Sequence, residues 1–249
     1  MAEEKQGYIG ALSGNAIKLI ACSLMLADHI GMILLPDVVA LRMIGRLAMP
    51  LFSFMFAEGC FYTRHKLRHF LTLLCMGVCT SAVMSAADDA PCGDILISFA
   101  LACPVIYSID MLIKSVFARD GRNSALLSAA LALSLALAVY VCLFSPVRVD
   151  YGLSGVLLPV TVRLLDFRSY GFTGAFSELY CHALAVVCFA LGLIAVSFES
   201  GGIQFYCLLS LPVLALYSGR RGDLPLKYFF YIFYPAHLAL LFLIRIAIF

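Results

Sequence analysis

The sequence predicts an all-α polytopic membrane protein, because its composition, its low charge and the length of its apolar segments all point to that class. Of the 249 residues, 63% are hydrophobic and 13% are charged. A water-soluble domain has about 45–50% apolar and about 25% charged residues. The mean hydropathy is +1.00, and one globule of this size cannot bury so much apolar surface. Most of that surface is expected to face lipid, the one partner that the composition itself predicts.

Nine apolar segments are predicted to cross the membrane as helices. A spanning helix needs about 20 apolar residues, with a range of about 17–25. The sixth segment contains Pro159 and is short, so it could instead be re-entrant. No repeat or linker divides the chain, and a single domain over residues 1–249 is expected. In chain order the predicted spans are residues 16–35, 47–63, 70–87, 95–117, 124–144, 151–166, 178–198, 203–218 and 227–248.

Polar stretches separate these spans. The first span follows a polar segment that lacks the basic start and the cleavage site of a signal peptide, so we expect it to be retained. Basic residues at 64–69 separate the second span from the third. Asp88, Asp89 and Asp94 separate the third from the fourth. Further polar stretches before the fifth, sixth and ninth spans are residues 118–123, 145–150 and 219–225.

The positions of lysine and arginine predict a cytoplasmic N-terminus and a C-terminus outside. Cytoplasmic loops near the ends of spans are enriched in these residues. Arg42, Arg46, Arg148 and Arg245 lie on the opposite side. The protein is accordingly expected to be integral to the bacterial cytoplasmic (inner) membrane. The cytoplasmic side would hold 13 of the 17 basic residues, namely Lys5, Lys18, Arg64, Lys66, Arg68, Lys114, Arg119, Arg122, Arg163, Arg168, Arg220, Arg221 and Lys227.

Charge, cysteine positions and motif absences exclude several other classes. The net charge of +2 gives no electrostatic footprint for a polyanion, so no nucleic-acid partner is expected. The ten cysteines form no C-x-x-C pair, and nine lie in apolar segments as packing residues do. We expect no metal site among them. The sequence lacks P-loop, nucleophile-elbow and H-E-x-x-H patterns, so nucleotide hydrolysis, serine-hydrolase and zinc-protease chemistry have no support.

The strongest candidate site lies in the first span, where Asp28 and His29 are adjacent. An ionisable residue at the centre of a spanning helix costs about 2.5–3.5 kcal/mol and usually faces a cavity or a partner. Histidine suits proton transfer near neutral pH, and a carboxylate can fix its tautomer. Helical neighbours point about 100° apart, so Asp28 need not touch His29. A polar contact between helices is the alternative. His65 and His69, in the basic stretch, are expected to be solvated or to face the lipid headgroups.

Charged residues also lie in or near the second span. Arg42 and Arg46 are four residues apart, so a helix places both guanidinium groups on one face. Such a pair suits an anion, an oxyanion or the Asp28 carboxylate, unless both side chains extend to the outer headgroups. Glu58 lies deep in the span and is expected to pair with a basic residue. Asp110, in the fourth span, is a weaker candidate for a cap or a pore-lining residue.

The last span carries a polar stripe. Tyr228, Tyr231, Tyr234 and His237 recur every three residues on an otherwise apolar segment. Pro235 removes one helical hydrogen bond, which predicts a kink. An aromatic belt at the membrane interface explains Tyr228 but not His237, which lies too deep. A functional role is therefore favoured for His237.

Several segments resemble the TraX family. Their order and spacing match over nearly the whole chain, whereas residues 118–148 and 166–200 are only generically apolar. TraX is known as the pilin N-acetylase of conjugative plasmids. Its family belongs with multi-span acyltransferases such as the O-antigen acetylases and heparan-α-glucosaminide N-acetyltransferase. The matching segments are residues 15–20 (NAIKLI), 24–31 (LMLADHIG), 41–52 (LRMIGRLAMPLF), 57–59 (AEG), 62–64 (YTR), 150–158 (DYGLSGVLL), 216–222 (LYSGRRG) and 226–238 (LKYFFYIFYPAHL).

This resemblance implies an integral membrane acetyltransferase that takes an acetyl group from cytoplasmic acetyl-CoA. The acceptor would be an amine or hydroxyl in or across the membrane, on a peptide N-terminus, a glycan, a lipid or a small amine. The superfamily uses a histidine of an early span, to which His29 corresponds, as a general base or an acetyl carrier. Asp28 would orient His29, and Arg46 would stabilise the oxyanion. The expected catalytic set is His29, Asp28, Arg46, Glu58 and His237.

The basic residues at the cytoplasmic side are expected to hold the phosphorylated nucleotide of coenzyme A. Two other classes stay open. A proton-coupled small-solute transporter would line a path with the same polar residues, although no inverted repeat is visible. A structural or sensory bundle would use them as contacts between helices. The residues expected to bind coenzyme A are Arg64, Lys66, Arg68, Arg220, Arg221, Lys227 and Tyr228.

Overall fold

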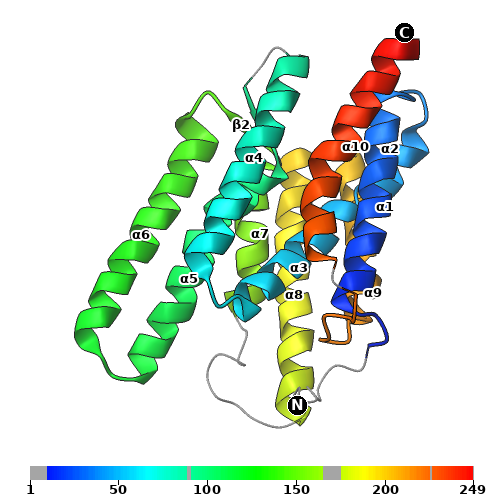
Figure 1. The fold of residues 1–249 in the computed structure, drawn as a ribbon. Coiled ribbons are helices and arrows are strands. Elements are labelled where there is room, and N and C mark those ends of the chain that lie inside the picture. Colours follow the sequence, from blue (N-terminus) through cyan, green and yellow to red (C-terminus); the bar gives the residue numbers. More distant parts are fainter. Residues whose placement is uncertain (1–9, 89–90, 165–174, 225, 249) are drawn as a thin grey trace.

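The protein is a bundle of helices in the computed structural model, which describes residues 10–88, 91–164, 175–224 and 226–248 (Figure 1). Within these ranges, the side chains of residues 86–88, 175–181, 227, 228 and 231 are not described. Two short strands, β1 (Cys92–Gly93) and β2 (Arg148–Val149), pair in parallel. The helices are α1 (Gly14–Ile33), α2 (Val39–Gly45), α3 (Ala48–Tyr62), α4 (Lys66–Asp88), α5 (Ile95–Phe117), α6 (Gly121–Phe144), α7 (Gly152–Leu164), α8 (Ala175–Ser200), the 3₁₀ helix η2 (Gly202–Ser210), α9 (Leu211–Ala215) and α10 (Lys227–Ile248).

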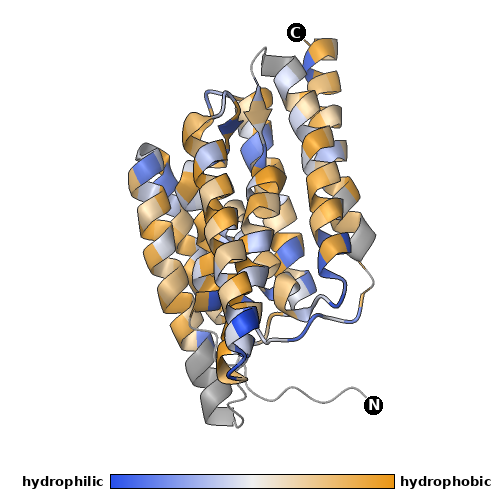
Figure 2. Ribbon diagram, turned by 90° about the vertical axis from the view of Figure 1, so that its left-hand side faces the viewer, coloured by the Kyte–Doolittle hydropathy of each residue, from blue (hydrophilic) through white to orange (hydrophobic). Residues whose placement is uncertain are grey.

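Six of the described helical segments are long and apolar enough to cross a membrane, which confirms the predicted class of all-α membrane protein. Apolar residues cover most of the length of the helices (Figure 2). Shorter apolar helices cover residues 152–164, 202–215 and 232–248. The count of nine spans and their orientation stay predictions. The six long segments are residues 14–33, 39–62, 66–85, 95–117, 121–144 and 182–200.

The predicted boundaries are closest where apolar length alone sets the helix. The fourth predicted span, 95–117, coincides with α5. The eighth, 203–218, differs, because its first part is the 3₁₀ helix η2 and α-helix ends at Ala215. Gly201 precedes η2 with a φ of 66°, and Gly202 begins η2 with a φ of 54°. Glycine adopts this left-handed geometry at little cost. A 3₁₀ helix rises about 2.0 Å per residue, so few residues cover a long distance here.

Aspartate caps fix the starts of two helices. Asp94 accepts a hydrogen bond from the Ile97 amide at the start of α5, and Asp120 accepts one from the Asn123 amide at the start of α6. Asp94 is buried and also accepts from the Thr80 hydroxyl. Burial raises the pKa of the Asp94 carboxyl, although these hydrogen bonds oppose the shift.

A buried ion pair links α5 to α7. Arg163 Nη2 lies 2.8 Å from Asp110 Oδ1, and the Arg163 guanidinium lies 4.6 Å from the Phe61 ring centre. Arg163 is 1% exposed. Asp110 was expected to be a cap or a pore-lining group. It is instead the ion-pair partner of Arg163 inside the bundle.

Leu12 and the first residues of α1 form backbone hydrogen bonds with the loop that precedes α10. The Leu12 amide donates to the Leu216 carbonyl at 2.9 Å, and the Gly14 amide donates to the Arg220 carbonyl at 2.8 Å. The Asn15 amide donates to the Arg221 carbonyl at 2.9 Å. These bonds place two arginines beside the start of α1. In the upper half of the bundle, α1 and α10 run side by side (Figure 1).

Candidate active site

Asp28, on α1, forms ion pairs with two arginines. Its Oδ2 lies 2.9 Å from Arg42 Nη1, and its Oδ1 lies 3.2 Å from Arg46 Nη2. Helices α1 and α2 approach closely because Gly45, at the end of α2, has no side chain, and a Cβ there would collide with Asp28. Both arginines therefore reach one carboxylate, which is one of the anions that their four-residue spacing suits.

His29 is bonded to His237, on α10. His29 Nδ1 lies 2.7 Å from His237 Nε2, and the two rings stack with their centroids 4.9 Å apart. His237 Nδ1 lies 2.7 Å from the carbonyl oxygen of Phe233. The sequence placed a carboxylate beside His29, but the Asp28 carboxylate faces the arginines. A second imidazole orients the His29 ring instead.

The Phe233 carbonyl fixes the tautomers along this chain of hydrogen bonds. A carbonyl oxygen only accepts, so His237 Nδ1 carries a hydrogen. Nε2 of neutral His237 then accepts, and His29 Nδ1 donates to it. His29 Nε2 is left with a lone pair. This is the form that a general base or a nucleophile requires.

Aromatic rings enclose the histidine pair. The Phe233 ring stacks on His237 with the centroids 4.9 Å apart. Tyr234 lies edge-on to both imidazoles, with centroid distances of 6.5 Å to His29 and 5.7 Å to His237. His237 is 5% exposed, and His29 is half-buried. Low-dielectric surroundings strengthen the hydrogen bond between them.

Arg46 extends the polar cluster to η2. Its Nη1 donates to Gln204 Oε1 at 3.3 Å. Among the described residues, no acceptor bonds to Arg46 Nε or to Gln204 Nε2, and both atoms are buried. A buried donor without a partner costs about 1–3 kcal/mol, which makes these two groups candidates for binding a ligand oxygen. Gln204 gave no signal in the sequence, because a single amide is common in any segment.

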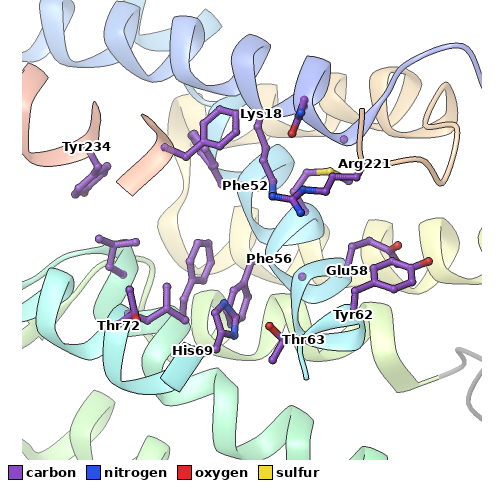
Figure 3. A pocket seen from close by; sticks show the side chains of 18 of the residues that line it. Lys18, Phe52, Phe56, Glu58, Tyr62, Thr63, His69, Thr72, Arg221 and Tyr234 are labelled. Atoms are coloured by element: carbon purple, nitrogen blue, oxygen red, sulfur yellow. The ribbon is translucent and has the colours of Figure 1, made fainter. Parts of the chain in front are cut away.

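A cavity of about 960 Å³ lies toward the basic end of the bundle (Figure 3). Lys18 of α1 and Arg68 of α4 line it. Arg64, which follows α3, and Arg220 and Arg221, which precede α10, also line it. Five cations from four parts of the chain thus share one cavity, as a polyanionic ligand requires.

The apolar part of the cavity leads toward the histidine pair. Met25 and Tyr234 line it. Met25 lies four residues before His29 on α1, and Tyr234 lies three residues before His237 on α10. The cavity therefore comes within about one helical turn of the pair. Neither histidine lines the cavity.

Only some of the residues predicted to bind coenzyme A line the cavity. Lys66 is directed elsewhere, with Nζ 4.9 Å from the Tyr107 ring centre. The side chains of Lys227 and Tyr228 lie outside the described part of the chain. Lys18 was assigned only to the cytoplasmic side, yet it lines the cavity. Four of the seven predicted residues line the cavity, namely Arg64, Arg68, Arg220 and Arg221.

Glu58 belongs to the cavity and not to the cluster around Asp28. It is 4% exposed and lies beside Tyr62 in the cavity wall (Figure 3). Glu58 is ten residues beyond Ala48, where α3 begins next to Arg46. This separation is about 15 Å along the helix axis. The predicted catalytic set is therefore divided between two places.

Fold and site together define a class of protein. Helices of membrane length surround a hydrogen-bonded histidine pair, an aspartate bound by two arginines and a cavity with a basic wall. Ionisable residues at such positions in a membrane bundle mark sites of function. The chain is a polytopic α-helical membrane protein with an internal polar site.

The chain belongs to the TraX family, as its motifs suggested, because the family profile described as "TraX protein" matches residues 13–245. It is 26% identical to "Probable fimbrial assembly protein FimC, serogroup H1" of Dichelobacter nodosus, over 92% of this chain and 94% of that protein. It is 32% identical to an uncharacterized protein of Rickettsia prowazekii (strain Madrid E), over 47% of this chain and 44% of that protein. No solved structure gives a significant match.

Proposed function

We propose that this protein is an integral membrane acetyltransferase. It takes an acetyl group from acetyl-CoA at the basic end of the bundle and delivers it to an amine or hydroxyl acceptor in or across the membrane. In this proposal the chain spans the bacterial inner membrane nine times, with its N-terminus cytoplasmic and its C-terminus outside. Its other partner is membrane lipid, and no nucleic acid takes part.

The observation that carries the proposal is the hydrogen bond between His29 and His237. The Phe233 carbonyl, His237 and His29 form a chain of hydrogen bonds that directs a lone pair to His29 Nε2. A purely structural contact between two helices requires one hydrogen bond and no particular tautomer. Acyl transfer requires this tautomer, because the reacting nitrogen has to accept a proton or attack a carbonyl carbon.

The cavity supports acetyl-CoA as the donor. Its volume of about 960 Å³ lies in the range of small-molecule sites, about 300–1,000 Å³. Its cations suit the phosphates of the nucleotide. Lys18 and His29 lie eleven residues apart on α1, about 16 Å along the helix axis. The extended pantetheine arm would cover this distance and bring the thioester past Met25 and Tyr234.

The proposed chemistry takes place at His29 Nε2. As a general base, Nε2 takes the proton of the acceptor amine or hydroxyl while that group forms a bond to the acetyl carbon. The carbon–sulfur bond then breaks, and the thiolate of coenzyme A leaves and is protonated. As a carrier, Nε2 bonds to the acetyl carbon itself while the carbon–sulfur bond breaks and the thiolate of coenzyme A leaves. In a second step the acceptor bonds to the acetyl carbon, the bond to Nε2 breaks, and Nε2 takes the acceptor's proton. The His237 contact supports either course, because it stabilises positive charge on His29.

The arginines supply electrostatic stabilisation in this proposal. Asp28 holds Arg42 and Arg46 in place through the ion pairs. Arg46 Nε and Gln204 Nε2 are the donors offered to the oxyanion that develops on the acetyl oxygen. Asp28 thus acts as a positioning residue for the arginines. Glu58 acts in the donor cavity, away from the reacting atoms.

The name of the relative from Dichelobacter nodosus suggests which candidate acceptor to test first. Its printed name is that of a fimbrial assembly protein. A peptide N-terminus on a fibre subunit is therefore the acceptor to test first. Glycans, lipids and small amines follow.

The proposal is tested by binding acetyl-CoA to detergent-purified protein and following release of the free thiol. Wild type is expected to bind the donor and hydrolyse it slowly. Arg220→Ala is expected to weaken binding, whereas Arg122→Ala, an exposed arginine outside the cavity, is expected to leave binding unchanged. If well-folded wild type binds no acyl-CoA, the proposal fails. Proton-dependent solute uptake into vesicles without acetyl-CoA would then support a transporter.

A further inference from the structure

Two cysteines and a histidine from three helices meet beside the donor cavity. Within the described residues, the ligand atoms of Cys60 (α3), His69 (α4) and Cys103 (α5) lie within 4.8 Å of one another. Cys60 is 1% exposed and Cys103 is fully buried. His69 was expected to be solvated, but it is half-buried, and its Nδ1 lies 2.7 Å from the Tyr107 hydroxyl. The histidine therefore points into the bundle and not into a basic loop.

The surroundings of this cluster are mostly apolar, although two cations lie nearby. Lys66 Nζ is 4.9 Å from the Tyr107 ring centre, and the Arg163 guanidinium is 4.6 Å from the ring of Phe61, the residue after Cys60. Both cysteines belong to a core that includes Phe56 and Phe99, whose rings stack 4.5 Å apart. The Phe56 ring also lies 5.9 Å from the His69 ring. Hydrogen bonds also join the group, because Cys103 bonds to Cys60 and to His69, and the Tyr107 hydroxyl bonds to both cysteines. Two thiols and an imidazole from three helices therefore converge on one point, which is the arrangement that a shared metal ion requires.

We propose that Cys60, Cys103 and His69 form a Zn²⁺ site with a fourth position open to water or to a ligand. Cys60 and Cys103 bind as thiolates, and His69 binds through Nε2. His69 Nδ1 then donates to the oxygen of Tyr107. A histidine that binds a metal almost always donates its other ring hydrogen to such a partner, which fixes the tautomer and the direction of the ring. Tyr107 is thus a positioning residue.

Charge and geometry both favour zinc. Two thiolates balance the charge of a divalent cation and the imidazole is neutral, so the bound site adds no net charge inside the bundle, where unpaired charge is costly. With Zn–S of about 2.3 Å and Zn–N of about 2.0 Å, tetrahedral ligand atoms are about 3.5–3.8 Å apart. The cluster, whose ligand atoms lie within 4.8 Å of one another, needs to contract by about 1.3 Å at most. Binding two thiols releases two protons, which makes zinc affinity rise with pH.

This inference does not depend on the proposed acetyltransferase activity. His69 also lines the donor cavity, so the metal would join α3, α4 and α5 at the cavity wall. Three protein ligands with an open position are typical of zinc sites that bind a further ligand. The site would hold its three helices together whether or not the cavity binds acetyl-CoA.

The test is the metal content of protein purified without chelators and without a metal-affinity tag. We expect about one zinc per chain, with X-ray absorption giving two sulfur ligands near 2.3 Å and a nitrogen ligand near 2.0 Å. Cys60→Ser and Cys103→Ser should each lose the bound zinc. Cys207→Ser, a cysteine that is equally buried on η2, should retain it. Wild type that contains no zinc and binds none on titration would overturn the proposal.

A milder variant keeps the proposal testable if the serine variants do not fold. Tyr107→Phe preserves the ring and all three ligands but removes the oxygen bonded to His69. We expect zinc affinity to fall about 10- to 100-fold, as it does when an outer partner of a metal ligand is removed. Cobalt-loaded wild type should show a thiolate-to-cobalt charge-transfer band that zinc-loaded wild type lacks. If Tyr107→Phe and wild type bind zinc equally, or if cobalt gives no thiolate band, the assigned site is wrong.

Discussion

The half of the bundle that holds the histidine pair differs from the basic end in how its polar groups are satisfied. In the first, Asp28 is held by Arg42 and Arg46, and His29 is held by His237. At the basic end, cations line a hollow of about 960 Å³. The charged and titratable groups of the first region are bonded to one another within the protein, whereas the cations of the second region face a hollow.

Under the proposed function, the two regions have different tasks. A reacting group has to be held in one tautomer and one direction, which requires partners from the protein itself. A binding site for a phosphorylated donor requires charges that the ligand neutralises. Changes in the first region should therefore reduce turnover, and changes in the second should weaken binding. The predictions below test that division.

The largest effect is expected for His29→Ala. This change removes the nitrogen that accepts a proton or an acetyl group, so turnover of bound acetyl-CoA should fall about 10²- to 10⁴-fold. Donor binding should be retained, because His29 does not line the cavity. His182→Gln alters another buried histidine and serves as the control. Equal turnover in His29→Ala and wild type would remove the distinction between the two regions.

Asp28→Ala should destabilise the fold. It leaves Arg42 and Arg46 without their carboxylate, and breaking a buried pair in this way costs about 3–5 kcal/mol. We expect a value near 3 kcal/mol, because the Arg42 side chain is 25% exposed. Thermal denaturation in detergent measures the loss. Replacing both arginines with methionine should remove most of the penalty, and an unchanged penalty in that background would contradict the ion-pair explanation.

His237→Phe should slow turnover without unfolding the protein. The ring is kept, but the acceptor of the His29 hydrogen is lost, and a buried hydrogen bond of about 1.5–3 kcal/mol corresponds to about 10- to 150-fold in rate. Because the two histidines act together, the double variant with His29→Ala should be no slower than His29→Ala alone. Additive losses would show that His237 acts by another route.

Lys18→Met should weaken donor binding and leave the rate of the bound complex unchanged. The substitution keeps the apolar stem beside Phe230 and removes one cation from the cavity. The loss of one charge-assisted contact should raise Kd about 10-fold, less at high salt. Lys114→Met, outside the cavity, is the control. A reduced rate with unchanged Kd would reverse the assignment of the two regions.

The smallest effect concerns the cap of α5. Burial raises the pKa of Asp94 above its ordinary value of 3.8, so the folded state holds that proton more tightly than the unfolded state. This contribution is lost as pH rises through the raised pKa. Asp94→Asn should therefore gain stability relative to wild type as pH rises above about 4. A stability difference between Asp94→Asn and wild type that does not change with pH would refute the effect of burial.

Much of the fold could be predicted because apolar length carries the signal. Residues 95–117 form α5 as predicted, since a run of apolar residues needs no knowledge of its neighbours. The segment 203–218 looked equally suitable, but its first half is a 3₁₀ helix that follows two left-handed glycines. Hydropathy does not distinguish the two kinds of helix.

The site could be predicted only where sequence spacing is local. Arg42 and Arg46 share a face by their four-residue spacing, and both reach Asp28. His29 and His237 are 208 positions apart, and their contact depends on how α10 packs against α1. Each histidine was a candidate because it lies deep in an apolar segment, but no local pattern could pair them. The clustering of cysteines from α3 and α5 was hidden for the same reason.

The central claim is that His29 presents an unprotonated Nε2. Nitrogen-15 NMR of the histidines, of which the chain has five, measures it directly when each signal is assigned by substitution. We predict that His29 and His237 both carry hydrogen on Nδ1, and that the His29 signals change in His237→Phe. A His29 ring with hydrogen on Nε2 would contradict the account.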